Sequence, residues 1–172
     1  MSIPITVTAL VLMSLTVFTQ DRARRENSTR KITVEAPASW DVRSEPYVLS
    51  VSAVAGPSDL FTPTVSMMIE PVSGERKRLK PYVQSFYSHN WLMLENMQGW
   101  TARDTTWDGL QASVADFTSS YSGAIMSTRV IMAVEGDSAY VSRAMWLNDA
   151  TPQQIDTALA VLRTAKRVKR SK

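Results

Sequence analysis

The chain has 172 residues, of which 44% are hydrophobic and 20% charged, with 19 basic side chains, 16 acidic ones and no cysteine. This length is enough for one domain with a buried core, and the composition is that of a globular protein. The lack of cysteine excludes disulfides, thiolate metal sites, cysteine catalysis and lipid attachment through cysteine. The single histidine argues against a histidine-dependent triad or metal site, so we expect no catalytic residue, no metal and no cofactor.

The small net charge of +3 hides a strong segregation. Residues 21–31 hold five basic and two acidic side chains, and the last ten residues hold six basic ones and no acid. Residues 32–162 therefore carry a net charge of −6. An acidic body argues against a nucleic-acid surface, which needs basic residues on a folded face. The basic ends are either simply solvated or attracted to anionic lipid head groups, with Arg22, Arg24 and Arg25 as the membrane-proximal candidates.

The first 19 residues form the one apolar segment of the sequence, with no charge between Ile3 and Phe18. Three interpretations stay open: an exported signal or signal anchor, an anchor whose basic flank stays on the cytoplasmic side, or a buried strand. No basic residue precedes the apolar run and no small-x-small cleavage site follows it. Residues 20–30 lack periodicity and are predicted to be a basic linker, and residues 168–172 a basic tail.

The body of the protein begins with patterns that are typical of strands. Apolar and polar side chains alternate along residues 31–36, and this pattern ends at Pro37. The turn that follows is expected to place Trp40 in the core. Residues 47–55 are rich in β-forming residues, with Leu49, Val51 and Ala53 on one face. A third strand is expected around Val65, Met67 and Ile69.

A long helix is expected next, opening near Leu79 with Pro81 in its first turn and running to Met97. Its apolar face covers about half of the helical wheel and must bury against a sheet or a partner. Methionine and aromatic side chains suit adaptable binding surfaces as well as cores. The candidates for a partner-binding surface are therefore Trp91, Met93 and Met97.

After Gly99 the strand patterns return. Residues 100–107 and 110–118 flank Asp108-Gly109, a strong two-residue hairpin signal. Residues 124–134 and 139–147 are joined by Gly136-Asp137, which predicts an antiparallel meander with helices on one face. A last helix opens at Thr151-Pro152-Gln153-Gln154, a capping box. The predicted fold class is α+β: an antiparallel sheet of about six to seven strands with two helices packed on it, after an N-terminal apolar segment.

The order of these elements over residues 31–167 resembles the PsbP-like fold shared by DcrB-like bacterial proteins. The matching features are the Pro37 to Trp40 step, an early hairpin, the helix opening at residues 79–82, and residues 109–112 entering the meander. The resemblance implies a PsbP-like α+β domain over 31–167, in a family of exported lipoproteins, photosystem accessory proteins and chaperones of secreted effectors. Most members bind partners and do not catalyse. This chain differs from the lipoproteins by its lack of cysteine and from the chaperones by its apolar N-terminus.

No side chains form a recognisable catalytic or phosphate-binding motif. His89 lies on a helix edge without an acid at helical spacing, so a structural or solvent-facing role is expected. Asp116 interrupts an apolar strand, which makes it a candidate for partial burial and a shifted pKa. A hydrolase built on Asp116 is the least favoured hypothesis, because it needs a pocket with a second titratable group.

The sequence thus predicts a non-catalytic, exported or membrane-tethered accessory domain that binds a protein or lipid-like partner. We expect a protein partner, with contact to a membrane surface as a further hypothesis, no nucleic acid, and a periplasmic or exported location with the alternative of inner-membrane anchoring. A second hypothesis is a cytoplasmic chaperone or adaptor for an apolar segment of a secreted protein.

Overall fold

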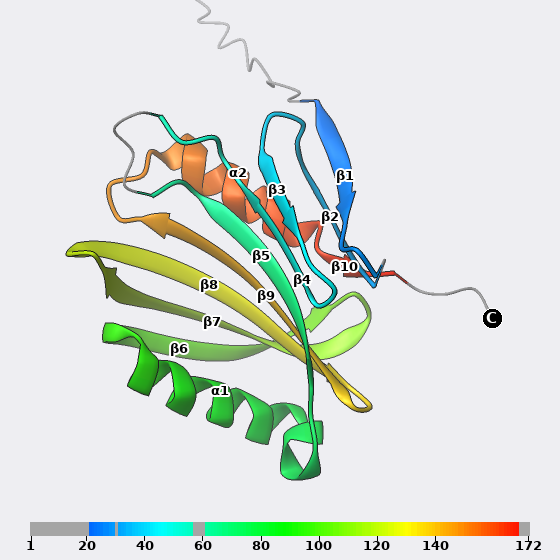
Figure 1. Cartoon of the computed structure of the whole chain (residues 1–172). Coiled ribbons are helices and arrows are strands. Elements are labelled where there is room, and N and C mark those ends of the chain that lie inside the picture. The colour runs from blue at the N-terminus through cyan, green and yellow to red at the C-terminus, as the bar shows by residue number, and fades with distance from the viewer. Residues whose placement is uncertain (1–20, 30, 57–60, 169–172) are drawn as a thin grey trace, which may run out of the picture.

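The computed structural model describes residues 21–29, 31–56 and 61–168 (Figure 1). Their strands form a seven-stranded sheet and a three-stranded sheet, in which every pair of neighbours is antiparallel. The large sheet has the order β3-β4-β5-β9-β8-β7-β6 and the small one β1-β2-β10. The predicted α+β class, with seven antiparallel strands and two helices, is confirmed. The strands of the large sheet are β3 (Asp41–Ser44), β4 (Val48–Ser52), β5 (Thr64–Pro71), β6 (Glu95–Trp107), β7 (Leu110–Tyr121), β8 (Ala124–Glu135) and β9 (Ser138–Leu147).

The expected meander from residue 95 to residue 147 is present, because β6, β7, β8 and β9 pair in sequence order. Its first hairpin turns at Asp108 and Gly109, whose φ angles are +48° and +79°. Trp107 and Leu110 pair directly across this turn. Two successive positive φ angles match the right-handed twist of the strands, and aspartate followed by glycine tolerates them better than other residue pairs.

Two helices cover the large sheet, α1 (Leu79–Met93) and α2 (Pro152–Arg163), and a short 3-10 turn, η1 (Gly74–Lys77), precedes α1. The expectation that both helices lie on one face is wrong. On β9, Ala139 and Val141 enter the α1 core, whereas Ala144 belongs to the core beneath α2. Side chains an even number of residues apart share a face of a strand, and those an odd number apart do not. The two helices therefore pack on opposite faces (Figure 1).

Helix α2 begins as its sequence predicts. The Thr151 side chain accepts a hydrogen bond from the Gln154 backbone N–H, and the Gln154 side chain accepts one from the Thr151 N–H, which completes the capping box. Ala158, Val161 and Leu162 are buried against the sheet, in the same core as Leu49 and Val51. The small sheet lies on this face too, because the apolar side chains of β2 (Ile32–Pro37) enter that core.

The prediction of a linker over residues 20–30 is wrong, because Arg22–Glu26 form strand β1, paired with β2 from Arg22 opposite Pro37 to Glu26 opposite Thr33. Strand β1 forms through backbone pairing with β2 and has no apolar periodicity. The hydrophobic pattern of the sequence therefore could not predict it. On the other side of β2 lies β10 (Lys166–Arg167), within the stretch treated as a basic end. The expected apolar segment 1–19 and most of the basic tail 168–172 lie outside the described residues.

The predicted continuation of the long helix to Met97 is also wrong, since α1 ends at Met93. Leu94 is extended, Asn96 has a φ of +50° and Gly99 a φ of +68°, and the pairing of β6 with β7 shifts register over the same stretch. Left-handed backbone at two positions is incompatible with a helix. Within residues 21–29, 31–56 and 61–168, no helix is long and apolar enough to span a membrane.

Candidate functional site

A cavity arises because α1 covers only part of its face of the large sheet. The helix packs on β6, β7 and β8 and is bonded to β5 through Tyr82 and Glu70, and beside it lies a groove lined by β3, β4, β5 and β9. The resulting groove has a volume of about 770 Å³. Its floor comes from strands β3, β4, β5 and β9, and one wall from α1 through Ser85, Phe86, His89 and Asn90.

A row of polar side chains crosses the floor of the groove. Arg43 pairs with Ser50, Ser50 with Ser66, and Ser66 with Arg143, so one rung of four neighbouring strands carries two arginines around two hydroxyls. Neighbouring strands lie roughly 4.8 Å apart, which separates the two arginine Cα atoms by roughly 14 Å. All four residues line the groove. We refer to Arg43, Ser50, Ser66 and Arg143 as the polar rung.

Arg143 differs from the other arginines of the groove. The guanidinium of Arg43 lies 2.7 Å from the Glu45 carboxylate, and that of Arg76 lies 3.1 Å from Glu70. Arg143 donates from Nε to the Ser66 hydroxyl at 3.0 Å, and no carboxylate of the described residues lies within ion-pair distance of it. The Arg143 side chain is exposed in the groove, and partial desolvation by the residues around it lowers its pKa.

The floor beside the polar rung is apolar. Two residues along each strand, Val48, Met68 and Val141 form the next rung across β4, β5 and β9. Val48 and Met68 are half-buried in the groove floor, whereas Val141 is 3% exposed beneath α1. Phe86 faces the same space from α1. The groove therefore combines a strip of apolar surface with an adjacent cationic strip, an arrangement suited to ligands with both kinds of group.

One end of the groove is closed by hydrogen bonds between η1, β5 and α1. The fully buried Tyr82 donates its hydroxyl hydrogen to the Glu70 carboxylate, which also binds Arg76. Burial raises the pKa of Tyr82, and the hydrogen bond to Glu70 and the charge of Glu70 raise it further. The phenol is thus held neutral, as a donor that fixes α1 against β5.

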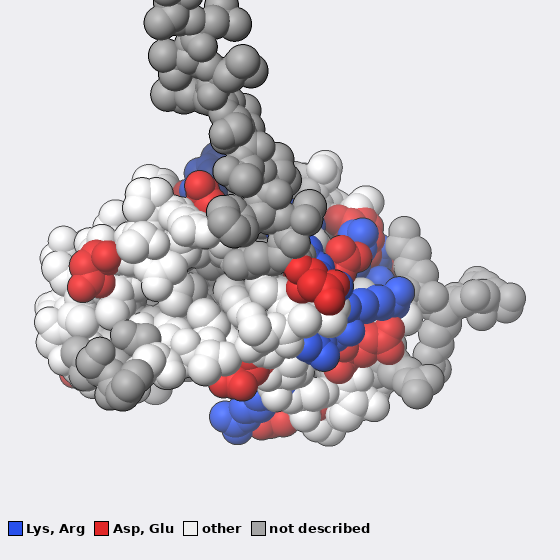
Figure 2. Space-filling model, turned by 90° about the horizontal axis from the view of Figure 1, so that it is seen from above, with Lys and Arg blue, Asp and Glu red and all other residues white. Residues whose placement is uncertain are grey.

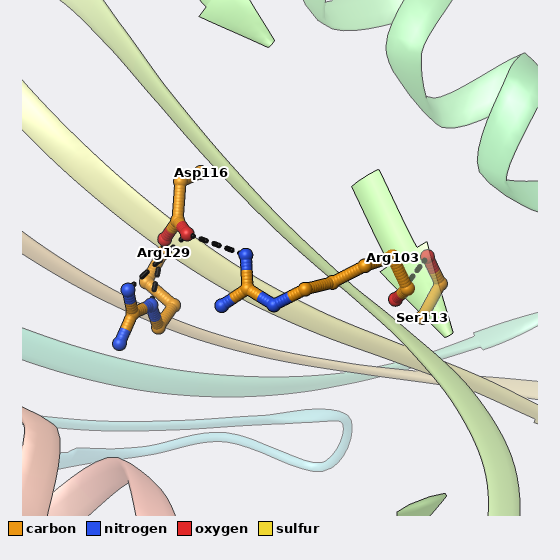
Figure 3. A network of polar contacts seen from close by, with 4 residues as sticks. All are labelled: Arg103, Ser113, Asp116 and Arg129. Carbon is orange, nitrogen blue, oxygen red and sulfur yellow. Dashed lines mark hydrogen bonds and ion pairs between the residues drawn. The ribbon is translucent and has the colours of Figure 1, made fainter. Parts of the chain in front are cut away.

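Asp116, the carboxylate that the sequence predicts to be partly buried, lies on the face of the sheet away from α1, because its strand neighbours Ala115 and Phe117 enter the α1 core. Its partners are two arginines (Figure 3). Arg129 donates to it from Nε at 2.6 Å, and Arg103 from Nη1 at 3.2 Å. Partial burial raises the pKa of Asp116, but the hydrogen bonds and charges of Arg129 and Arg103 outweigh it, so the pKa lies below its ordinary value. The expected partial burial and shifted pKa are present. The direction is that of a structural ion pair and not of a general acid, which needs a raised pKa.

The three predicted partner-binding residues are not brought together. Trp91 and Met93 are 54% and 69% exposed at the C-terminal end of α1, whereas Met97 is 4% exposed in the core beneath that helix. Met97 therefore cannot contribute to a surface. Strand pairing of Glu95 with Ser120 places the helix end next to the β7–β8 hairpin. Five exposed apolar side chains, which we call the apolar tip, lie at this end of the sheet: Trp91, Leu92, Met93, Tyr121 and Ile125.

The three predicted membrane-proximal arginines lie on β1. Arg24 pairs with Glu26 at 2.9 Å, and Arg25 donates to the Ala38 carbonyl at 3.1 Å, while Arg22 is exposed. Seen from above, basic and acidic side chains lie next to one another, and most of the remaining surface is uncharged (Figure 2). Contact of these arginines with a membrane stays a prediction. In the described part of the chain, no cluster of three or more histidine and acidic side chains could hold a metal ion.

Sequence reasoning missed the polar rung. Ser50, Ser66 and Arg143 occupy the polar positions of alternating strands, and such positions are expected simply to face water. His89 was placed on a helix edge, and the structure shows that this edge is a wall of the groove. The sequence does show Arg143 between β-forming residues of a strand. Only the register of β4, β5 and β9 places it beside Ser50 and Ser66.

The sequence matches no protein-family model and no curated protein. Three solved structures are similar to this chain over most of its length. A Pseudomonas aeruginosa protein of unknown function, PA94, described as a putative regulator, has a TM-score of 0.60 at 12% identity, with 88% of this chain and 99% of that one covered.

LpqN of Mycobacterium tuberculosis, described as involved in cell envelope biogenesis, has a TM-score of 0.59 at 15% identity over 87% of this chain and 91% of that one. Cyanobacterial PsbP from Synechocystis has a TM-score of 0.60 at 10% identity over 89% of this chain and 96% of that one. At such identities the likeness concerns the fold alone. The resemblance inferred from the sequence is confirmed at that level: the chain has a PsbP-like fold.

Proposed function

We propose that this protein is a non-catalytic accessory domain, exported or held at a membrane, that binds a protein or lipid-like partner in the groove beside α1. The observation that carries this proposal is the uncovered part of the α1 face, where a sheet that could have been closed by a second helix leaves an open cavity of about 770 Å³. Cavities of roughly 300–1,000 Å³ are usual for ligand sites.

Two further features support a binding role. The groove displays charged, hydroxyl and apolar side chains together, and the carboxylates that line it, Glu45 and Glu70, are paired with arginines. The proposed location rests on the apolar character of residues 1–19 and on the cell-envelope role stated for LpqN, a protein of the same fold.

The lack of native cysteine permits a direct test, because an introduced thiol is unique in the chain. Ser85→Cys places it in the groove wall and Gln153→Cys places it on exposed α2, on the opposite face. Each variant is labelled with a thiol-reactive photo-cross-linker in the source cells, and the adducts are identified by mass spectrometry. We expect an adduct specific to Ser85→Cys. Equal adducts from both positions would contradict binding in the groove.

The apolar tip favours a second candidate function, the adaptor for an apolar segment of a secreted protein. Leu92 is 81% exposed, and its neighbours Trp91 and Met93 are both more than half exposed. Contiguous exposed apolar side chains are uncommon on monomeric proteins and mark interaction sites. Fractionation of cells that express a C-terminal fusion separates the candidates, since the adaptor would stay in the cytoplasm and the first candidate would not.

A further inference from the structure

One arginine of the polar rung, Arg143, has no acidic partner among the described residues. Two cations of the groove, Arg43 and Arg76, have carboxylate partners at 2.7 and 3.1 Å. Arg143 has none in the described residues, and among these its side chain makes a single hydrogen bond, from Nε to Ser66. The two Nη groups, with four N–H donors, are therefore without a protein partner in the described structure.

Ser66 fixes the direction of the guanidinium. By accepting from Nε it leaves the opposite, forked edge of Arg143 for a ligand, and this edge matches the two oxygens of a carboxylate or phosphate. Ser50 adds a hydroxyl donor one strand away on the same rung. Arg143 is exposed in the groove, so an incoming anion can reach its guanidinium directly.

The neighbouring rung limits what the rest of the ligand can be. Val48 and Met68 lie one step along the strands, and Phe86 faces them from α1. A small inorganic anion would leave this apolar strip in contact with water. A ligand with an alkyl body next to its charged head would cover it.

We propose that the groove binds an anionic amphiphile, a carboxylate or phosphate head group on an alkyl chain, with the head on the Arg143 fork beside Ser50 and Ser66 and the chain over Val48, Met68 and Phe86. This inference rests on the proposed function and gives its partner a chemical class. A fatty acid and a lipid phosphate share this chemistry, and the experiment distinguishes them.

The test titrates the full chain by calorimetry with dodecanoate, dodecyl phosphate and uncharged dodecanol, each below its aggregation concentration. We expect both anions to bind at least about tenfold more tightly than the alcohol, because hydrogen bonds to a charged group are stronger than neutral ones. The tighter of the two anions identifies the head group. Acetate and inorganic phosphate, which lack the chain, should bind weakly.

The variant Arg143→Gln should reduce anion affinity about tenfold or more and leave dodecanol binding unchanged. Arg163→Gln is the matched control, because it removes the same charge from the exposed last turn of α2 on the opposite face. Arg143→Lys keeps the charge without the fork and should fall between. Thermal unfolding of each variant establishes that it is folded.

Equal binding of dodecanoate and dodecanol, or equal losses in Arg143→Gln and Arg163→Gln, would overturn the anionic-amphiphile assignment. So would tight binding of an acidic peptide with no binding of either alkyl anion. If the Ser85→Cys adduct nevertheless forms in the groove, the proposed function stands and the ligand class alone fails. If no adduct forms and no amphiphile binds, both fail.

Discussion

At the scale of single residues, Asn27 shows how much structure a stretch without apolar pattern can hold. It is 1% exposed, and its Oδ1 accepts from the backbone N–H groups of Lys31 and Ile32 at 2.7 and 3.0 Å. Its Nδ2 donates to the Pro46 carbonyl at 2.7 Å. One side chain thus joins the β1–β2 turn to the loop before β4, in a segment that composition marks as a linker.

Replacing this amide should be costly. Asn27→Ala leaves the Lys31 and Ile32 N–H groups without their side-chain acceptor, while the Pro46 carbonyl keeps the Thr29 hydroxyl as a donor. We expect a loss of about 2–3 kcal/mol in the free energy of unfolding. Urea denaturation measures it. The adjacent exposed Ser28→Ala is the control and should change stability by less than about 0.5 kcal/mol. Equal effects would show that the buried amide contributes nothing.

Asp116 gives a pH dependence whose sign follows from its environment. Its pKa is lower in the folded protein than the ordinary 3.8, since Arg129 and Arg103 outweigh the effect of burial. The stabilisation is therefore complete above the unfolded-state pKa and is lost as the pH falls through the folded-state value. With 31% of the side chain exposed, we expect about 0.5–1 kcal/mol.

The measurement compares urea denaturation at about pH 6 and about pH 3. Asp116→Asn removes the titrating group, so the drop in stability between these pH values should shrink by about the same 0.5–1 kcal/mol. Arg129→Gln should shrink it too, because it removes the main partner. A drop that is unchanged in both variants would refute this account.

At the scale of elements, Met93 and Met97 lie in different elements, α1 and β6, although the sequence pattern places both on one face of a single helix. Met93 lies on the exposed end of α1, while Met97 lies after the helix has ended, on β6, and points into the core. Helical spacing could not distinguish them, because the distinction depends on the left-handed backbone at Asn96 and Gly99. Apolar periodicity shows which residues prefer burial and carries little information on where a helix gives way to a strand.

Truncation of the two methionines should destabilise the protein to very different extents. Met97→Ala removes buried methylene and sulfur atoms and should cost about 2–4 kcal/mol of stability. Met93→Ala should cost less than about 0.5 kcal/mol, since 69% of that side chain is exposed. Thermal unfolding of both variants under one set of conditions checks the pair. A larger effect at Met93 would mean that α1 continues as the sequence pattern suggested.

Most of the regular elements were predictable, for local reasons. The hairpin at Asp108-Gly109 and the capping box at Thr151 depend on neighbours in sequence, and both are present. The strands β1, β3 and β10 were missed because pairing forms them and their side chains are mostly exposed or half-buried. The polar rung was missed for a related reason: its members lie far apart in sequence and become neighbours only through register.

At the scale of the whole molecule, Arg167 joins the two sheets. It lies on β10 of the small sheet, and its guanidinium donates to the Asp108 carboxylate at 3.0 Å and to the Asp108 carbonyl at 2.9 Å. It also binds Glu135, at the end of β8. Asp108 therefore has two roles, since it turns the β6–β7 hairpin and holds the C-terminal strand.

Removing this connection should loosen the whole fold. The Arg167 and Asp108 side chains are 11% and 14% exposed, so Arg167→Ala leaves a nearly buried carboxylate without its cation and with only the backbone N–H of residue 167 as a donor. We expect a loss of about 2–3 kcal/mol, measured by urea denaturation. Lys166→Ala, on the same short strand but exposed, is the control. If both variants lose equal stability, strand β10 as a whole and not the Arg167 side chain contributes the stabilisation.

The small sheet has a consequence for how the molecule can be held. Arg22 pairs with Pro37 on one side of β2 and Arg167 pairs with Ile32 on the other, so both ends of the described chain leave from the α2 side (Figure 1). The groove opens on the other side of the large sheet. The molecule thus has a front, with the groove, and a back, from which the chain continues beyond Asp21 and Val168.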